Sequence, residues 1–201
     1  MIGKWNKSVI LTYLGLAASA AGIALLSPYC DVDLKYVYIL LMFAGICDMF
    51  DGTIARKCKR NKEEKEFGIQ LDSLVDVFSF IALPLAILAT VNENIYYIPI
   101  FIIYAICGVA RLAHFNTIAP ENTPVKYYVG LPVTFSALIF PLLYILAYFI
   151  KSDPFMIIYN VVTLIVAILF VIKIKVPKPK VKSSIFLLLL AIAVTIFYVL
   201  V

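Results

Sequence analysis

Apolar runs long enough to cross a bilayer recur along the whole chain, and no other feature constrains the fold as strongly. Hydrophobic residues make up 64% of the 201 residues and charged residues only 14%, whereas a soluble domain is about half apolar. The mean hydropathy, +1.02, agrees with this reading. We therefore predict an all-α polytopic membrane protein in which residues 1–201 form a single integral membrane domain.

Seven membrane-spanning helices are expected from the spacing of these runs and of the turn-forming segments between them. Their approximate ranges are 9–26, 36–56, 68–91, 98–112, 128–150, 154–172 and 184–200. The segment KIKVPKPKVK, residues 173–182, is the nearest thing to a linker, because its two prolines interrupt any helix.

The basic residues predict the orientation in the membrane. With the N-terminus in the cytoplasm, all of the 17 lysines and arginines except Lys35 and Lys151 fall at inner ends or in inner connections. Inner loops of membrane proteins carry such an excess. We therefore expect a multi-pass protein of the cell membrane with a cytoplasmic N-terminus and an outer C-terminus. The net charge of +5 is then mainly a topology signal, and no nucleic-acid partner is expected.

Four aspartates lie beside or inside these apolar stretches: Asp48, Asp51, Asp72 and Asp76. An ionised aspartate at the bilayer centre costs about 2.5–3.5 kcal/mol, so four facing lipid would cost on the order of 10 kcal/mol. That sum is comparable to the stability of a whole fold. The aspartates must therefore face a protein interior, water or a cation. Asp48 precedes Arg56 by about 12 Å of helix, which places the group a shallow distance below the cytoplasmic surface.

Helical spacing places the aspartates on two faces. Asp48, Asp51 and Ala55 follow i, i+3, i+7 on the second helix, and Gly68, Asp72 and Asp76 follow i, i+4, i+8 on the third. A short loop joins these helices, so they run antiparallel and their carboxylates can converge. Hard divalent cations, which take oxygen ligands, would compensate the charge. Because carboxylate-bridged metal pairs are common in phosphoryl chemistry, we expect two cations per site, with Mg²⁺ and Mn²⁺ as the first candidates.

Small and basic residues beside the aspartates suit a phosphate ligand. Gly52 and Ala55 leave room for a ligand at the helix backbone, and Gly68 offers a second close approach. Arg56 supplies a guanidinium fork for a phosphate. The alternative for the glycines is close packing between membrane helices.

The pattern Asp48-x2-Asp51-Gly52-x2-Ala55-Arg56, then Gly68-x3-Asp72-x3-Asp76, resembles the signature of the CDP-alcohol phosphotransferases. These membrane enzymes move a substituted phosphate from a CDP-linked donor to an alcohol and release CMP. The resemblance implies a six-helix core plus one span, a cytoplasmic active site and a homodimer. It implies that the four aspartates hold two metals and that Asp76 is also the general base. It further implies that the CDP site is lined by Gly52, Ala55, Arg56 and Gly68.

Two further stretches, GVARLAHFNT and YYVGLPVTFSAL, resemble the phosphatidylserine synthase branch of that family and imply L-serine as the acceptor. The candidate acceptor-binding residues are Arg111, His114 and Asn116. Arg111 can pair with the serine carboxylate through a bidentate fork. His114 stands where that branch usually has arginine, which departs from the pattern. The alternatives are a lipid anchor for Arg111 and a structural hydrogen bond for His114.

Two other functions remain open on the sequence. A sister phosphotransferase using glycerol phosphate or inositol phosphate would favour a denser basic cluster at the acceptor site. A cation transporter would need carboxylates near the midplane and access from both sides. The CDP-linked lipid donor can carry ester-linked acyl or ether-linked isoprenoid chains. Tyrosines near helix ends are expected to be interfacial anchors: Tyr36, Tyr96, Tyr97, Tyr127 and Tyr128.

Overall fold

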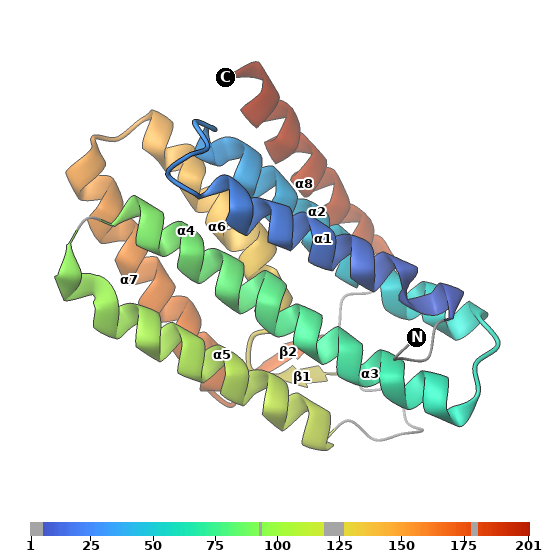
Figure 1. The fold of residues 1–201 in the computed structure, drawn as a ribbon. Coiled ribbons are helices and arrows are strands. Elements are labelled where there is room, and N and C mark those ends of the chain that lie inside the picture. The colour runs from blue at the N-terminus through green and yellow to red at the C-terminus, as the bar shows by residue number, and fades with distance from the viewer. Residues whose placement is uncertain (1–5, 93, 119–126, 178–180) are drawn as a thin grey trace.

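The computed structural model describes residues 6–92, 94–118, 127–177 and 181–201, which are almost entirely helical (Figure 1). Lys4, Lys126, Lys178 and Lys180, which the orientation argument counts as inner basic residues, lie outside the described residues. The helices are α1 (Ile10–Leu25), α2 (Leu34–Lys57), α3 (Lys62–Val77), α4 (Leu83–Val91), α5 (Ile98–Ile118), α6 (Ser136–Tyr144), α7 (Ser152–Val171) and α8 (Val181–Leu200). A π-helical turn, Phe78–Ala82, joins α3 and α4 into one rod.

Six helical stretches of the described chain are long and apolar enough to cross a membrane. This confirms the prediction of an all-helical, polytopic membrane protein. The fifth expected span, 128–150, is shorter in the structure, where the apolar helix covers Val133–Tyr148 and ends in 3₁₀ geometry. The orientation of the bundle in the membrane stays a prediction.

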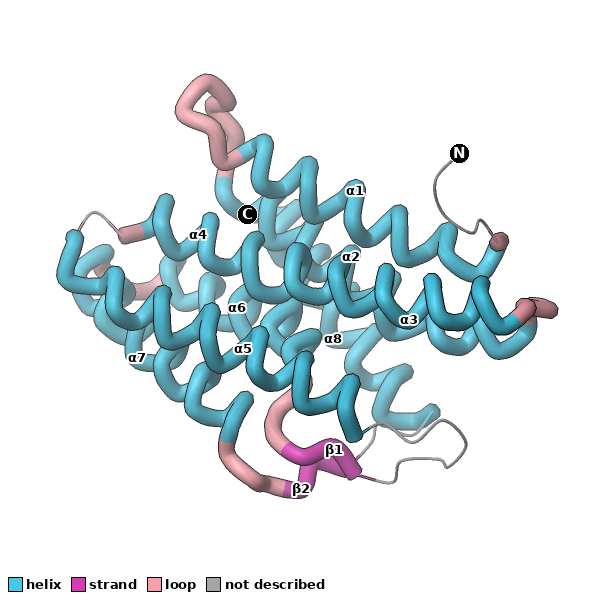
Figure 2. Tube along the Cα trace, turned by 60° about the horizontal axis from the view of Figure 1, so that its bottom comes forward, coloured by secondary structure: helices cyan, strands magenta, loops and turns pink. Residues whose placement is uncertain are grey.

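Two short strands account for the shorter fifth helix. β1 (Tyr127–Val129) pairs with β2 (Lys175–Pro177) in an antiparallel sheet at one end of the bundle (Figure 2). Tyr128 was expected in a helix, and β2 lies in the expected linker. Gly130 follows β1 with φ +77°, a conformation that favours glycine, and donates its N–H to the carbonyl of Ile174 at 2.9 Å. A Cβ at Gly130 would meet the carbonyl oxygen of Phe170.

Small residues allow close helix contacts, as is common where apolar helices pack in lipid. A Cβ added to Gly15 of α1 would lie 3.3 Å from the Cβ of Cys47 on α2. A Cβ on Gly45 would lie 2.7 Å from the Cβ of Ala137, so α2 and α6 leave no room for a larger side chain. α2 is therefore held closely on two sides.

The π-helical turn is anchored by neighbouring helices. The hydroxyl of Tyr104 on α5 donates to the carbonyl of Phe80 at 2.8 Å, and Ser136 of α6 donates to the same oxygen at 3.2 Å. A π turn lacks the regular i to i+4 bonding of an α-helix, so outside partners stabilise it. The rod is thus fixed immediately after Asp76.

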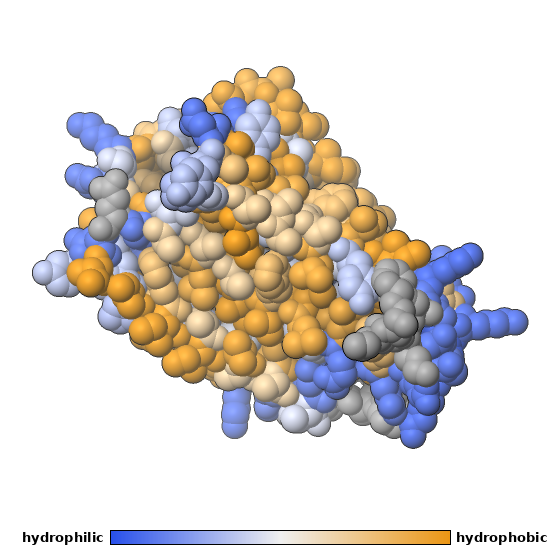
Figure 3. Space-filling view, viewed as in Figure 1, coloured by the Kyte–Doolittle hydropathy of each residue, from blue (hydrophilic) through white to orange (hydrophobic). Residues whose placement is uncertain are grey.

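The bundle has two distinct ends. The start of α1, the α2–α3 connection and the end of α5 lie together, with β1 and β2 close by (Figure 1). We call this the carboxylate end, because it holds Asp48, Asp51, Asp72 and Asp76. Figure 3 shows hydrophilic residues concentrated there and a broad hydrophobic surface over the middle of the bundle. The other end is called the tyrosine end, after Tyr38, Tyr144, Tyr159 and Tyr198.

Candidate active site

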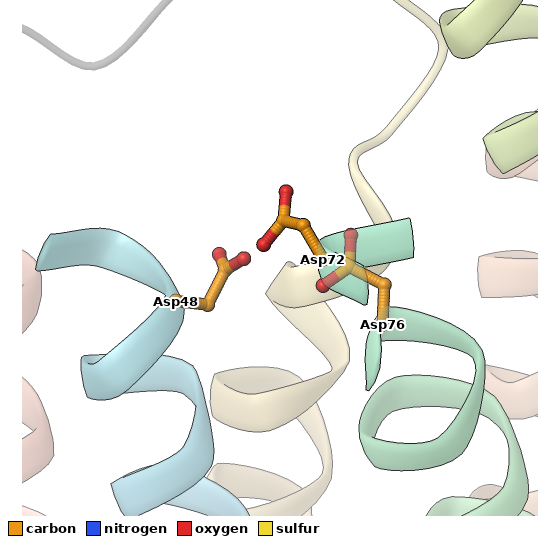
Figure 4. A group of neighbouring side chains, drawn as sticks. All are labelled: Asp48, Asp72 and Asp76. Carbon is orange, nitrogen blue, oxygen red and sulfur yellow. The ribbon is translucent and has the colours of Figure 1, made fainter. Parts of the chain in front are cut away.

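All four aspartates line one small pocket at the carboxylate end. Thr12 and Gly15 of α1 and Ser79 of the π-helical turn complete part of its wall. Carboxylate oxygens of Asp48, Asp72 and Asp76 lie within 4.8 Å of one another. These three side chains point toward a common centre from α2 and α3 (Figure 4). The convergence expected from the helical spacing is therefore present.

Asp51 lies beside this group of three. Its side chain is buried, and its Oδ2 accepts a hydrogen bond from the hydroxyl of Thr12 at 3.1 Å. Asp51 also lies within hydrogen-bonding reach of Asp72, as Asp48 does of Asp76. The carboxyl groups thus form two pairs across the α2–α3 interface, and α1 supplies a neutral donor to one of them.

The donor set fits hard divalent cations. Several carboxylate oxygens facing one small space repel one another unless a cation or protons compensate them. Mg²⁺ and Mn²⁺ prefer such oxygen ligands. Asp48, Asp72 and Asp76 could together hold a metal ion, and Asp51 is placed to contribute from the same helix face.

The expected CDP-binding residues lie on both sides of the α2–α3 connection. Gly52 is exposed, and a Cβ there would lie 3.7 Å from Nη1 of Arg56. Arg56 donates from Nη2 to the hydroxyl of Thr53 at 3.0 Å. Ala55 is half-buried on the same helix. This arrangement leaves bare backbone next to a guanidinium, which suits a phosphate.

Gly68 repeats that arrangement with an arginine that the motif does not include. A Cβ at Gly68 would lie 3.5 Å from Nη1 of Arg60, which belongs to the α2–α3 connection. The sequence placed Arg60 only among the inner basic residues. No local pattern could have paired Arg60 with Gly68, because the contact depends on how the connection folds back over α3.

Arg111 is the one buried residue among the three acceptor candidates. Its side chain is only 5% exposed, and its guanidinium carbon lies 5.3 Å from the centre of the Phe115 ring. It interacts electrostatically with Asp76 and with Tyr128. Among the described residues, its buried Nε has no hydrogen-bond partner. An anchor for lipid phosphates would be exposed instead.

Asn116 and His114 differ in placement. Asn116 donates to the hydroxyl of Ser73 at 2.8 Å and so links α5 to α3 next to Asp72. His114 is exposed, and its backbone carbonyl accepts a hydrogen bond from the hydroxyl of Thr117. Neither residue lines the small pocket of the aspartates.

Tyr128 was expected to be an interfacial anchor, but it is half-buried beside these groups. It interacts electrostatically with Asp48, Arg111 and Arg56. Burial, followed by the charge of Asp48, raises the pKa of Tyr128 above its ordinary value, so the hydroxyl is protonated and can donate at neutral pH. Its place in the stretch YYVGLPVTFSAL was its sequence signal.

Comparison with known proteins agrees with this geometry. Residues 5–200 match the model of the family described as CDP-alcohol phosphatidyltransferase. The chain is 31% identical to archaetidylserine synthase of Methanothermobacter thermautotrophicus over 121 residues. These residues cover 59% of the chain and 50% of that protein. It is 37% identical over 110 residues to CDP-diacylglycerol–serine O-phosphatidyltransferase of Saccharomyces cerevisiae, covering 51% and 38% respectively.

A protein of the latter name from Methanocaldococcus jannaschii is 34% identical over 102 residues, which cover 51% of the chain and 47% of that relative. The chain therefore spans half or less of the length of each of these curated relatives.

Proposed function

The chain belongs to the CDP-alcohol phosphatidyltransferase family, and on that premise we propose that it transfers a phosphatidyl group, or its ether-lipid equivalent, from a CDP-linked lipid to L-serine and releases CMP. The observation that carries the reaction class is the convergence of Asp48, Asp72 and Asp76 on one centre. Serine as the acceptor is supported by the buried guanidinium of Arg111 beside Asp76. The names of the relatives point the same way.

In this proposal Asp48, Asp51, Asp72 and Asp76 hold two divalent cations. When bound, such cations neutralise the diphosphate of the donor and the charge that develops on departing CMP. The backbone at Gly52, Ala55 and Gly68 lets the CDP group approach closely. Arg56 offers a fork to its phosphates.

Proton transfer is assigned to Asp76. The hydroxyl oxygen of serine attacks the lipid-side phosphorus of the donor, and the bond from that phosphorus to the oxygen of CMP breaks. The hydroxyl proton passes to the Asp76 carboxylate, and the bonding electron pair leaves with CMP. Asp76 is the motif aspartate furthest along its helix face, and it is the motif aspartate with which Arg111 interacts electrostatically. Arg111 would hold the serine carboxylate in a bidentate pair, with Asn116 and His114 at the outer edge.

A phosphorylated acceptor is the alternative within the family. Glycerol phosphate or inositol phosphate carries two negative charges near the hydroxyl and would need several basic side chains. Among the described residues, Arg111 is the only basic side chain that is buried. One buried guanidinium matches the single carboxylate of serine better. A cation transporter would not need the CDP-binding features that adjoin the aspartates.

Purified protein, reconstituted with CDP-diacylglycerol or its ether-lipid counterpart, tests the proposal through CMP release. L-Serine, glycerol 3-phosphate and inositol phosphate are supplied one at a time, with Mg²⁺ or Mn²⁺. We expect release to require L-serine. Release with a phosphorylated acceptor only would overturn the serine assignment, and no release with any alcohol would overturn the activity.

Asp76→Asn separates the two roles of that residue. The variant should stop transfer yet still bind CDP-lipid, because the other carboxylates remain for the metals. Normal turnover by this variant would remove Asp76 from the role of base. The homodimer and the cytoplasmic side of the site are proposals too, which cross-linking and labelling of Cys58 from either side of the membrane would check.

A further inference from the structure

Tyr128 lies on the inward face of the two-stranded sheet. In β1, Tyr127 and Val129 are exposed and Tyr128 between them is half-buried, as alternation along a strand requires. Tyr128 pairs in register with Val176 of β2. The sheet is fixed to α7 by the N–H of Leu131, which donates to the carbonyl of Leu169 at 2.9 Å. The strand therefore sets the direction of the Tyr128 side chain.

Tyr128 and Arg111 share a neighbour. The Tyr128 ring meets the Phe115 ring edge-on at 5.8 Å between centroids, and the Arg111 guanidinium lies over the same Phe115 ring at 5.3 Å. The Cδ of Arg111 lies 3.5 Å from the position of a Cβ on Gly130. The sheet and the end of α5 thus bring a phenol and a guanidinium to one place.

The surroundings of Tyr128 connect three expected subsites. Its hydroxyl is close enough to interact with Asp48 of the metal group, Arg56 of the CDP group and Arg111 of the acceptor group. The phenol therefore stands among residues expected to hold the metals, the CDP group and the acceptor.

We propose that Tyr128 is an acceptor-binding residue whose hydroxyl donates a hydrogen bond to the anionic group of the acceptor alcohol, beside Arg111. This inference rests on the proposed function, since it concerns the acceptor of the same reaction. Arg111 supplies charge, and Tyr128 adds a directional neutral donor. A donor held by a strand has a fixed direction, so it favours an acceptor whose carboxylate lies in that direction.

Tyr128→Phe tests this directly, because it removes the hydroxyl and keeps the ring against Phe115. A hydrogen bond to a charged group is worth enough to raise the KM for L-serine about 10- to 150-fold, with CDP-diacylglycerol affinity unchanged. Tyr127→Phe is the matched control, since Tyr127 is the exposed neighbour on the opposite strand face. That control should leave both constants unchanged.

The outcomes separate this inference from the proposed function. If the wild type uses another alcohol and ignores serine, the serine proposal fails, and the KM for the accepted alcohol decides the role of Tyr128. An unchanged acceptor KM in Tyr128→Phe overturns the inference, as does an equal loss of CDP-diacylglycerol binding. Thermal unfolding checks whether Tyr128→Phe is folded. If it is not, Tyr128→Met, which fills the space without a hydroxyl, takes its place in the same comparison.

Discussion

The carboxylate end and the tyrosine end of the bundle differ in whether their buried polar groups have hydrogen-bond partners of opposite kind. At the tyrosine end, the hydroxyls of Tyr38 and Tyr159 form a hydrogen bond of 2.7 Å, and Tyr198 donates to the carbonyl of Pro141. Tyr38, Tyr159 and Tyr198 are completely buried. At the carboxylate end, four acidic groups face one another around a pocket. One end pairs donors with acceptors, and the other gathers groups that repel.

This difference indicates that the tyrosine end stabilises the fold and that the carboxylate end carries the activity. Satisfied hydroxyl pairs stabilise a buried cluster modestly, and an unpaired one is costly. Clustered carboxylates lower stability without a ligand, so their presence needs a functional reason. Stability and activity should therefore respond to substitution at different ends.

The largest effect is expected from the metal group. Asp48→Asn, Asp51→Asn or Asp72→Asn should each lower CMP release by more than about a hundredfold. Loss of a residue that only supports a metal ligand lowers activity about 10- to 100-fold, and loss of the ligand itself should lower it more. The metal-free variants should unfold at the same or a higher temperature, since one like charge is gone. Chelation should abolish activity reversibly.

Asp31 is an exposed aspartate that precedes α2, away from the carboxylate end, so Asp31→Asn is the control. Its rate of CMP release should equal that of the wild type. Full activity in excess chelator would contradict the two-metal site.

Arg111→Lys should raise the KM for serine about 10- to 150-fold, because lysine keeps the charge but loses the fork and one charge-assisted contact. Affinity for the CDP-lipid, measured separately by binding, should change little. If both substrates weaken together, or neither does, Arg111 is structural, and the serine assignment loses its charged support.

Thr12→Val should act on the carboxylate end through its contact with Asp51. It removes the donor to Oδ2 of Asp51 while keeping the shape of the side chain. We expect the Mg²⁺ concentration for half-maximal CMP release to rise about tenfold, as for other contacts that orient metal ligands. Thr163→Val is the control, because it removes a hydroxyl that donates to the Tyr159 carbonyl at the tyrosine end. Its Mg²⁺ concentration for half-maximal CMP release should equal that of the wild type.

The smallest effect belongs to the tyrosine end and concerns stability alone. Tyr38→Phe should lower the free energy of unfolding by about 0.5–2 kcal/mol, because Tyr159 loses its partner. The rate of CMP release per folded molecule should not change. Tyr38→Phe combined with Tyr159→Phe should recover part of the loss, as a double-mutant cycle would show. A drop in turnover in the folded variant would show that the two ends are coupled.

The sequence predicted what depends on local spacing. Hydrophobic run length gave the membrane helices, and the i, i+3 and i, i+4 positions of Asp48, Asp51, Asp72 and Asp76 gave their convergence. Both follow from helix geometry within a few turns. The positions of Gly52 and Arg56 were predictable for the same reason.

Contacts between distant segments were not predictable in this way. The β1–β2 pair joins residues about fifty positions apart, and it moved Tyr128 from an expected helix to the inward face of a strand. Thr12 meets Asp51 only because α1 packs against α2, and Arg60 meets Gly68 only through the fold of a connection. Single-sequence periodicity carries no information on such pairings.

The π-helical turn after Asp76 has a consequence for how this chain can change in length. A residue in an α-helix advances the chain by about 100° around the axis, and a π turn holds about one residue more than an α turn. Deleting one residue from Phe78–Ala82 would turn the π turn into an α turn and leave α4 facing nearly as before relative to Asp72 and Asp76. A second deletion there would rotate α4 by about 100°, so that Leu83, Ile87 and Leu88, which are completely buried, would leave the core or the aspartates would leave the pocket. The π turn thus lets the rod lose one residue, and no more, without a choice between the core and the metal ligands.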